Sequence, residues 1–243
     1  MNGSPGRSQV ALITGASKGL GFALASALGR RGWRLVIDAR SPDALHAAAA
    51  ALRAAGADEV VALAGDVADP AHRDALVRAV AAHGGADVVV NNASTLGVTP
   101  LPPLRTYPLD ALAAVFAVNV IGPVALAQAL LPTLAARRGA LVNITSDAAV
   151  EGYEGWGGYG ASKAALEQVS RVLAAEEPDV RVYWVDPGDL RTQMHQDAFP
   201  GEDIGDRPLP EVAVPGLLRL LDERPPSGRY RAQQLAPDRT VSS

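Results

Sequence analysis

Short apolar runs alternate with longer alanine-rich stretches from the start of the chain to about residue 185. The runs have the length of strands, and none shows the polar alternation of a strand with one wet face. This pattern predicts parallel βαβ units joined by right-handed crossovers, with helices on both faces of the sheet. We predict strands at 10–14, 34–38, 59–64, 87–91, 140–144 and 181–185, and helices at 19–31, 42–55, 70–82, 109–137 and 158–175.

The predicted fold class is therefore α/β, with one doubly wound parallel sheet in a three-layer α/β/α arrangement. A chain of 243 residues fits a single domain that spans 1–243 without an interior linker. Beyond Met194 the pattern weakens, and 195–210, rich in Pro, Gly and Asp, predicts a substrate-side loop. A helix at 211–222 and a short edge strand near 228–232 should follow, and the ends 1–8 and 236–243 should be frayed.

Composition narrows the classes of function. The hydrophobic share of 48%, the charged share of 20% and the net charge of −4 are typical of a globular protein and supply no basic surface for nucleic acid. The chain contains no cysteine, which excludes disulfides and thiol catalysis. Its histidines are scattered without metal-ligand spacing, so we expect no metal site.

No segment has the pattern of a membrane anchor. Residues 1–9 are polar, unlike a signal peptide. Residues 111–131 come closest to a membrane span, but Asn119, Gly122-Pro123 and Gln128 interrupt them, which favours a buried helix. We expect a cytoplasmic protein with no membrane partner.

Polar and glycine residues follow all six predicted strands. Because the carboxyl ends of parallel strands meet at one edge of a sheet, these residues should gather where open α/β sheets bind ligands. The segments are 14–21, 38–40, 66–67, 91–94, 145–146 and 186–188.

The first of these segments contains Gly15, Gly19 and Gly21. Glycines at a strand-to-helix turn let backbone amides and the positive end of the helix approach a pyrophosphate. The spacing Gly-x-x-x-Gly-x-Gly is weak evidence by itself, and a tight turn without a ligand is the alternative.

Tyr159 and Lys163 stand four residues apart among glycines, alanines and serines. This spacing places them on one helix face, which by itself fits an ordinary amphipathic helix. Chemically, a tyrosine hydroxyl is a poor acid or base at neutral pH because its pKa is about 10, and a nearby ammonium group would lower that value. The pair could therefore move a proton to or from an oxygen atom.

The chain resembles the short-chain dehydrogenase/reductase family in several motifs together. They are TGASKGLG at 14–21, DV at 66–67, NNAS at 91–94, Asn119 in VNV, Ser146 in NITSD, YGASK at 159–163 and DPGDLRTQM at 186–194. The resemblance covers about 9–194, and the separation of thirteen positions between Ser146 and Tyr159 matches the family's spacing. It implies a Rossmann-type fold and hydride transfer between a nicotinamide cofactor and a carbonyl or alcohol substrate.

The resemblance also implies roles for individual residues. Tyr159 would be the general acid or base, Lys163 would also bind the nicotinamide ribose, and Ser146 would hydrogen-bond the substrate oxygen. Asn119 would hold a water that connects Lys163 to solvent, although a buried residue at a helix kink is an equal alternative. The implied cofactor-binding set is Gly15, Ser17, Lys18, Gly19, Leu20, Gly21, Arg40, Asp66, Val67, Asn92, Ala93, Tyr159, Lys163, Pro187, Gly188 and Thr192, and for Thr192 a helix N-cap is the alternative.

Charge favours NADP(H) over NAD(H). Lys18 and Arg40 occupy the positions where phosphate-preferring members of the family have basic residues. Asp38 complicates this assignment, because NAD-preferring members have an acidic residue one position later, where this chain has Ala39.

The resemblance does not identify the substrate, because the sequence after Thr192 differs from the family's pattern. Leu96, Tyr153, Trp156, Leu190 and Phe199 are candidates for an apolar pocket that takes a ring or medium-sized ketone, with ordinary core packing as the alternative. The segment near 173–188 resembles sepiapterin reductase locally.

The residues leave alternatives for the function and for the direction of the reaction, and they also suggest an oligomeric state. A noncatalytic NADP-binding redox sensor or assembly module is the alternative function, and alcohol oxidation is the alternative direction of the reaction. The long helices at 109–137 and 158–175 could pair across a two-fold axis, which predicts a homodimer.

Overall fold

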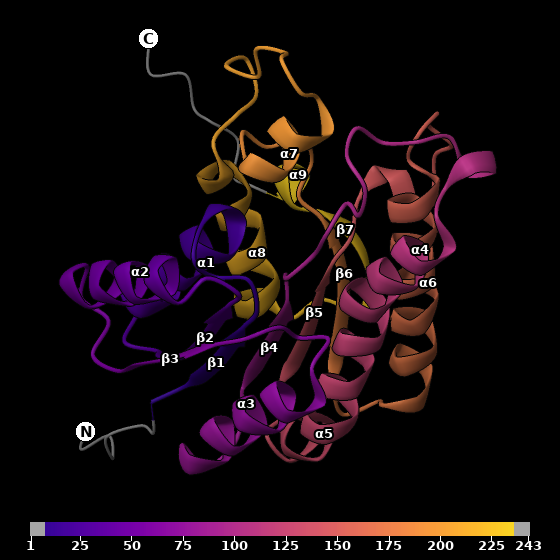
Figure 1. Ribbon diagram of the computed structural model, residues 1–243. Helices are drawn as coiled ribbons and strands as arrows, with labels where there is room; N and C mark the ends of the chain where they lie inside the picture. The colour runs from indigo at the N-terminus through magenta and orange to yellow at the C-terminus, as the bar shows by residue number, and fades with distance from the viewer. Residues whose placement is uncertain (1–7, 236–243) are drawn as a thin grey trace, which may run out of the picture.

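A computed structural model describes residues 8–235, and the predicted frayed ends lie almost wholly outside this range. Seven parallel strands form one sheet in the order β3-β2-β1-β4-β5-β6-β7 (Figure 1). The predicted α/β doubly wound fold is confirmed. The strands are β1 (Val10–Ile13), β2 (Arg34–Ala39), β3 (Val60–Ala64), β4 (Val88–Asn91), β5 (Ala140–Ile144), β6 (Arg181–Asp186) and β7 (Gly228–Arg231).

Helices cover both faces of the sheet and bury a separate core on each. Neighbouring strand residues point to opposite cores, so Ile13 and Ile37 lie in one and Leu12 and Val36 in the other. The first core is covered by α1 (Gly19–Gly29), α2 (Pro42–Ala54) and α8 (Val214–Glu223). The second is covered by α3 (Pro70–Ala82), α5 (Gly122–Ala136) and α6 (Gly157–Glu176).

Local capping explains where two of these helices begin. Ser41 precedes α2 and its hydroxyl accepts from the Ala44 N–H, while Asp69 precedes α3 and accepts from the Ala71 N–H. A proline follows each cap, where its missing N–H costs no helical hydrogen bond.

The predicted helix at 109–137 is interrupted in the structure. It consists of α4 (Leu109–Phe116), a π-helical turn η2 (Ala117–Ile121) and α5. Pro123 has no N–H to donate to the Asn119 carbonyl four residues earlier, so a wider turn replaces the regular α-helix there.

The span Leu109–Ala136 is, among the described residues, the one helical segment long and apolar enough to cross a membrane. About 33% of its most apolar window is buried. Leu126, Leu130 and Leu134 contribute to the second core, whereas Ile121 is exposed, so the predicted burial of this helix is confirmed only in part.

The C-terminal part is more ordered than the sequence indicated. The predicted loop at 195–210 begins with α7 (Gln193–Ala198), because Thr192 caps that helix. A 3₁₀ turn η4 (Pro210–Ala213) leads into α8, whose Pro215 lies in the first turn, where proline is tolerated. The predicted last strand is β7, which pairs with β6 and is followed by α9 (Ala232–Leu235).

The chain reverses its direction of winding between β1 and β4. The connection after β1 passes through α1 on one face, and the connection after β4 passes through α5 on the other. A crevice outside the carboxyl ends of the strands is expected at such a switch point.

Candidate active site

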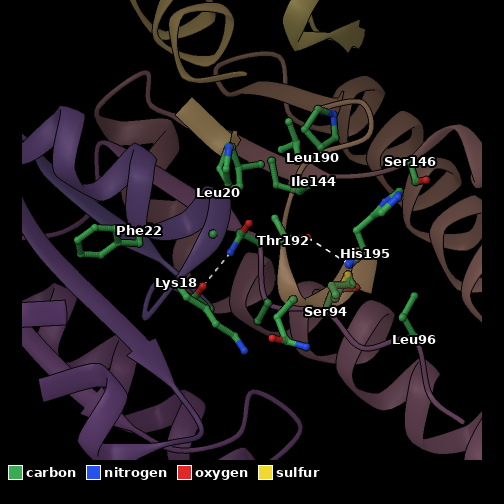
Figure 2. Close-up of a pocket in the computed structure, with 18 of the residues that line it drawn as sticks. Lys18, Leu20, Phe22, Ser94, Leu96, Ile144, Ser146, Leu190, Thr192 and His195 are labelled. Carbon is green, nitrogen blue, oxygen red and sulfur yellow. Dashed lines mark hydrogen bonds between the residues drawn. The ribbon is translucent and has the colours of Figure 1, made fainter. Parts of the chain in front are cut away.

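A cavity of about 1140 Å³ lies at the carboxyl ends of the strands. Figure 2 shows Lys18 and Phe22 toward one side of it, Ser146 and Leu96 toward the other, and Thr192 between them. Most of the site residues predicted from the sequence line this cavity, namely Gly15, Ser17, Lys18, Gly19, Leu20, Arg40, Asp66, Val67, Asn92, Ala93, Ser146, Tyr159, Lys163, Pro187, Gly188 and Thr192.

The glycine turn has the geometry that a phosphate cradle needs. Gly15 and Gly19 have φ angles of +66° and +60°, which side chains other than glycine rarely adopt. A Cβ on Gly15 would also lie 2.9 Å from the Ala93 Cα atom. The turn leads directly into the N-terminus of α1, whose free amides and positive dipole end suit a pyrophosphate. These residues fit a nicotinamide dinucleotide.

Gly21 does not line the cavity, unlike the other glycines of the motif. A Cβ there would lie 2.5 Å from Asn92 Nδ2 and 2.7 Å from the Gly15 carbonyl oxygen. Asn92 Nδ2 donates to the carbonyl oxygens of Thr14 (2.8 Å) and Gly15 (3.0 Å). Gly21 therefore acts indirectly, because it makes room for the amide that holds the turn.

The Asp38 carboxylate is engaged inside the protein. Its Oδ1 accepts from the Gly15 N–H at 2.7 Å, and its Oδ2 lies 3.0 Å from His72 Nε2. The residue is only 1% exposed. Asp38 thus supports the glycine turn through its carboxylate, and it lines the cavity together with Lys18 and Arg40.

Ser146, Tyr159 and Lys163 come from two adjacent elements. Ser146 follows β5 and caps the short turn η3 (Asp147–Ala149), while Tyr159 and Lys163 lie in the first two turns of α6. Lys163 Nζ donates to the Ile144 carbonyl oxygen at 2.8 Å and lies 5.5 Å from the centre of the Tyr159 ring. The lysine thereby ties α6 to the end of the strand that leads to Ser146.

Asn119 does not line the cavity. Its amide donates to the Thr95 carbonyl and to Ser162 Oγ, both at 2.9 Å, and its Oδ1 accepts from the Thr95 N–H and from Ser94 Oγ. An asparagine side chain has two donor hydrogens and two acceptor lone pairs, so all of them are used. The side chain therefore has no group left for the expected water, and it fits the alternative of a buried residue at a helix kink; a water on the Asn119 backbone stays a prediction.

Thr192 both caps α7 and lines the cavity, so the two predictions made for it are compatible. Thr192 Oγ1 accepts from the His195 N–H at 3.2 Å, as Figure 2 shows. Gly188, with a φ of +75°, donates its N–H to Asp186 Oδ1 at 2.9 Å. These two hydrogen bonds fix the loop after β6 at Gly188 and at Thr192, beside the cavity.

Comparison with known proteins agrees with this geometry. The short chain dehydrogenase family model matches residues 9–203, most of the chain. The chain belongs to the short-chain dehydrogenase/reductase family.

Several relatives of this short-chain dehydrogenase are known. The 2-(R)-hydroxypropyl-CoM dehydrogenase of Xanthobacter autotrophicus is 34% identical over 84% of each chain. Mouse sepiapterin reductase is 35% identical over 77% of this chain and 76% of its own length, so that similarity is more extensive than the local one predicted. A solved short chain dehydrogenase from Shigella flexneri, complexed with NADP, superimposes with a TM-score of 0.86 at 30% identity, covering 93% of this chain and 97% of its own.

Burial controls the protonation of the tyrosine and lysine in this short-chain dehydrogenase. Desolvation raises the pKa of Tyr159 above its ordinary value, and the hydroxyls of Ser146 and Ser94 oppose this shift only in part. Desolvation also lowers the pKa of Lys163 to about 7. The tyrosine pKa is therefore shifted upward, opposite to the lowering that we expected from the lysine.

The substrate side of the cavity contains residues that the sequence did not single out. Leu96, Tyr153, Trp156, Leu190 and Phe199 line it as predicted. The residues missed are Asp147, Met194, His195, Arg207 and Glu211. Asp147 could have been found because it directly follows Ser146 at a strand end, and Met194 because it ends the DPGDLRTQM motif. His195, Arg207 and Glu211 lie beyond that motif, on the C-terminal segment.

The buried lysine predicts a pH-dependent stability. The unfolded chain holds the Lys163 proton up to its ordinary pKa of 10.5, but the folded chain releases it near pH 7, so this group makes stability rise with pH between these values. Lys163→Met should remove this dependence. We expect its melting temperature to exceed that of the wild type most at pH 6, with the difference shrinking toward pH 9.5.

Thermal unfolding followed by circular dichroism at pH 6 to 9.5 measures this effect. Lys18→Met, at the chain's other lysine, is the matched control because Lys18 is exposed, and it should show a constant difference. A difference between Lys163→Met and wild type that does not change over this pH range would contradict the assignment.

Proposed function

We propose that the protein is an NADP(H)-dependent oxidoreductase that transfers hydride between nicotinamide and a carbonyl or alcohol, with Tyr159 as general acid or base. One observation carries this proposal: Ser146, Tyr159 and Lys163 line the same cavity as the glycine turn. A noncatalytic cofactor binder would have no need for a tyrosine proton donor beside a serine hydroxyl.

When bound, the nicotinamide group would supply or accept the hydride. The protein's own residues would bind and protonate the carbonyl oxygen of the substrate. The Ser146 hydroxyl, which donates to Asp147 Oδ1 in this structure, would turn to donate a hydrogen bond to that oxygen. Tyr159 would deliver the proton as negative charge develops. Because burial raises the pKa of Tyr159, the tyrosine is protonated at neutral pH, which is the form that donates a proton when the carbonyl is reduced.

Three observations support NADP(H) rather than NAD(H). Lys18 and Arg40 line the cavity and can pair with a 2′-phosphate. Asp38, the acidic residue nearest to the position that would bind free ribose hydroxyls, is engaged by Gly15 and His72. The Shigella flexneri relative is complexed with NADP, as its description states.

The substrate side favours a ring or medium-sized ketone. The rings of Trp156 and Tyr159 meet edge to face with their centres 5.7 Å apart, and Phe199 lies 6.0 Å from Trp156. This aromatic wall suits a flat or alicyclic group. Asp147 adds a carboxylate that accepts from Ser146 Oγ at 2.8 Å and from the Tyr153 hydroxyl at 3.0 Å.

We further propose a cytoplasmic homodimer without a membrane or nucleic-acid partner. Apolar side chains remain exposed on the helices predicted to pair, including Leu109 at 78% and Val172 at 43%. Their burial between two copies would be favourable.

Tyr159→Phe removes the proton donor and should leave the cavity intact. We expect NADPH oxidation to fall by about 10² to 10⁴-fold on a panel of cyclic ketones, diketones, quinones and pterins, with NADPH affinity retained. Absorbance loss at the NADPH band measures the rate. Tyr230→Phe is the matched control, because that tyrosine does not line the cavity.

Two outcomes of this assay would count against the proposal. Equal rates for Tyr159→Phe and wild type would exclude Tyr159 as the acid. Tight NADPH binding without turnover on any panel member would favour the noncatalytic alternative.

Arg40→Ala tests the cofactor preference. Loss of a charged hydrogen bond to phosphate should weaken NADPH binding by roughly 10 to 100-fold and leave NADH binding nearly unchanged. Fluorescence titration measures both affinities. Arg78→Ala, an exposed arginine on α3, should change neither, and an unchanged NADPH affinity in Arg40→Ala would exclude the assignment.

Light scattering at micromolar concentration tests the oligomeric state. We expect twice the mass of one chain, because the exposed apolar faces of the long helices would be covered by a second copy. A monomer mass would remove the homodimer proposal.

A further inference from the structure

One guanidinium group joins three segments behind the active-site cavity. Arg229 of β7 donates from Nε to Glu167 Oε1 at 2.9 Å. Its Nη2 donates to the Ser146 carbonyl oxygen at 3.1 Å and to Asp186 Oδ2 at 3.3 Å. Arg229 does not line the cavity, so it touches the site only from behind.

Glu167 connects this group to the helix of the tyrosine and lysine. It lies on α6 one turn beyond Lys163, with its side chain 1% exposed. Thr145 Oγ1 donates to it at 2.9 Å, and Arg171 Nη2 donates to it at 3.0 Å. A carboxylate buried this deeply needs charged and hydrogen-bonding partners, so its position fixes theirs.

Asp186 connects the same group to the turn at Pro187-Gly188, which belongs to the predicted cofactor-binding set. This residue ends β6, and its Oδ1 accepts from the Gly188 N–H. Arg229 therefore links α6, the end of β5 with Ser146, and the turn at Pro187-Gly188.

We propose that Arg229 is a positioning residue, which sets where Ser146 and the Pro187-Gly188 turn lie relative to Tyr159. The inference rests on the proposed function, because it concerns the same site. Ser146 and Tyr159 lie on different elements, and proton transfer requires their hydroxyls to converge closely on one oxygen. A planar guanidinium with fixed donor directions can hold three acceptors in one arrangement, which a lysine ammonium cannot reproduce.

Kinetics of Arg229→Met and Arg229→Lys test the proposal. Misplacement of about 1 Å can lower a rate on the order of 10²-fold, so we expect both variants to lose roughly 10 to 100-fold in kcat, with a much smaller change in KM. Glu167 keeps Thr145 and Arg171 as partners in both. Arg229→Lys also keeps the positive charge, which preserves the measurement if the methionine variant does not fold.

Arg231→Met is the matched control. Arg231 lies two residues further along β7, is 53% exposed and reaches Asp186 only at 3.9 Å. It should retain the wild-type kcat. If Arg229→Met melts earlier but has wild-type kcat below its melting temperature, Arg229 is a structural brace and the proposal is wrong.

Amide hydrogen exchange separates this inference from the proposed function. Both Arg229 variants should exchange faster than wild type at 145–149 and 187–190, whereas Arg231→Met should not. This readout needs no substrate, so it tests whether Arg229 holds these two segments even if wild type shows no Tyr159-dependent turnover, a result that would count against the proposed function alone. Unchanged exchange in both Arg229 variants would overturn the positioning role.

Discussion

The winding of the sheet is the constraint on which the site depends. Helices leave β1 and β4 on opposite faces, so no crossover covers the space between the carboxyl ends of these strands. The cavity lies there, and the glycine turn after β1 and the residues after β4 and β5 line it. The predicted site residues lie near the cavity because they follow the carboxyl ends of strands on either side of this point.

Buried polar groups hold the cavity walls from behind. Asp38 supports the glycine turn, Asn119 connects the Thr95 backbone to Ser162, and Ser162 Oγ donates to the Tyr159 carbonyl oxygen. Glu167 and Arg229 do the same for the segments around Ser146. Such groups are tolerated in the interior only with partners, and their directional bonds therefore fix the backbone that carries the reactive side chains.

Burial also sets the balance of charge at the site. Burial raises the pKa of Tyr159, which favours its protonated form, and lowers the pKa of Lys163, which favours its neutral form. From the four-residue spacing we predicted that the lysine lowers the pKa of the tyrosine, but spacing contains no information about desolvation. Lys163 instead has a structural contact with the end of β5 and lies close to the tyrosine ring.

The sequence by itself determined the fold class, the strands to within a residue or two, and many of the residues that line the cavity. Apolar periodicity and the motifs at strand ends are local, and parallel strands bring those ends to one edge. Tertiary structure decided the rest: the engagement of Asp38, the saturated amide of Asn119, the supporting place of Gly21, and the link from Arg229 to Ser146. These depend on contacts between residues far apart in the chain, and neither spacing nor residue type records which partner a buried polar group will meet.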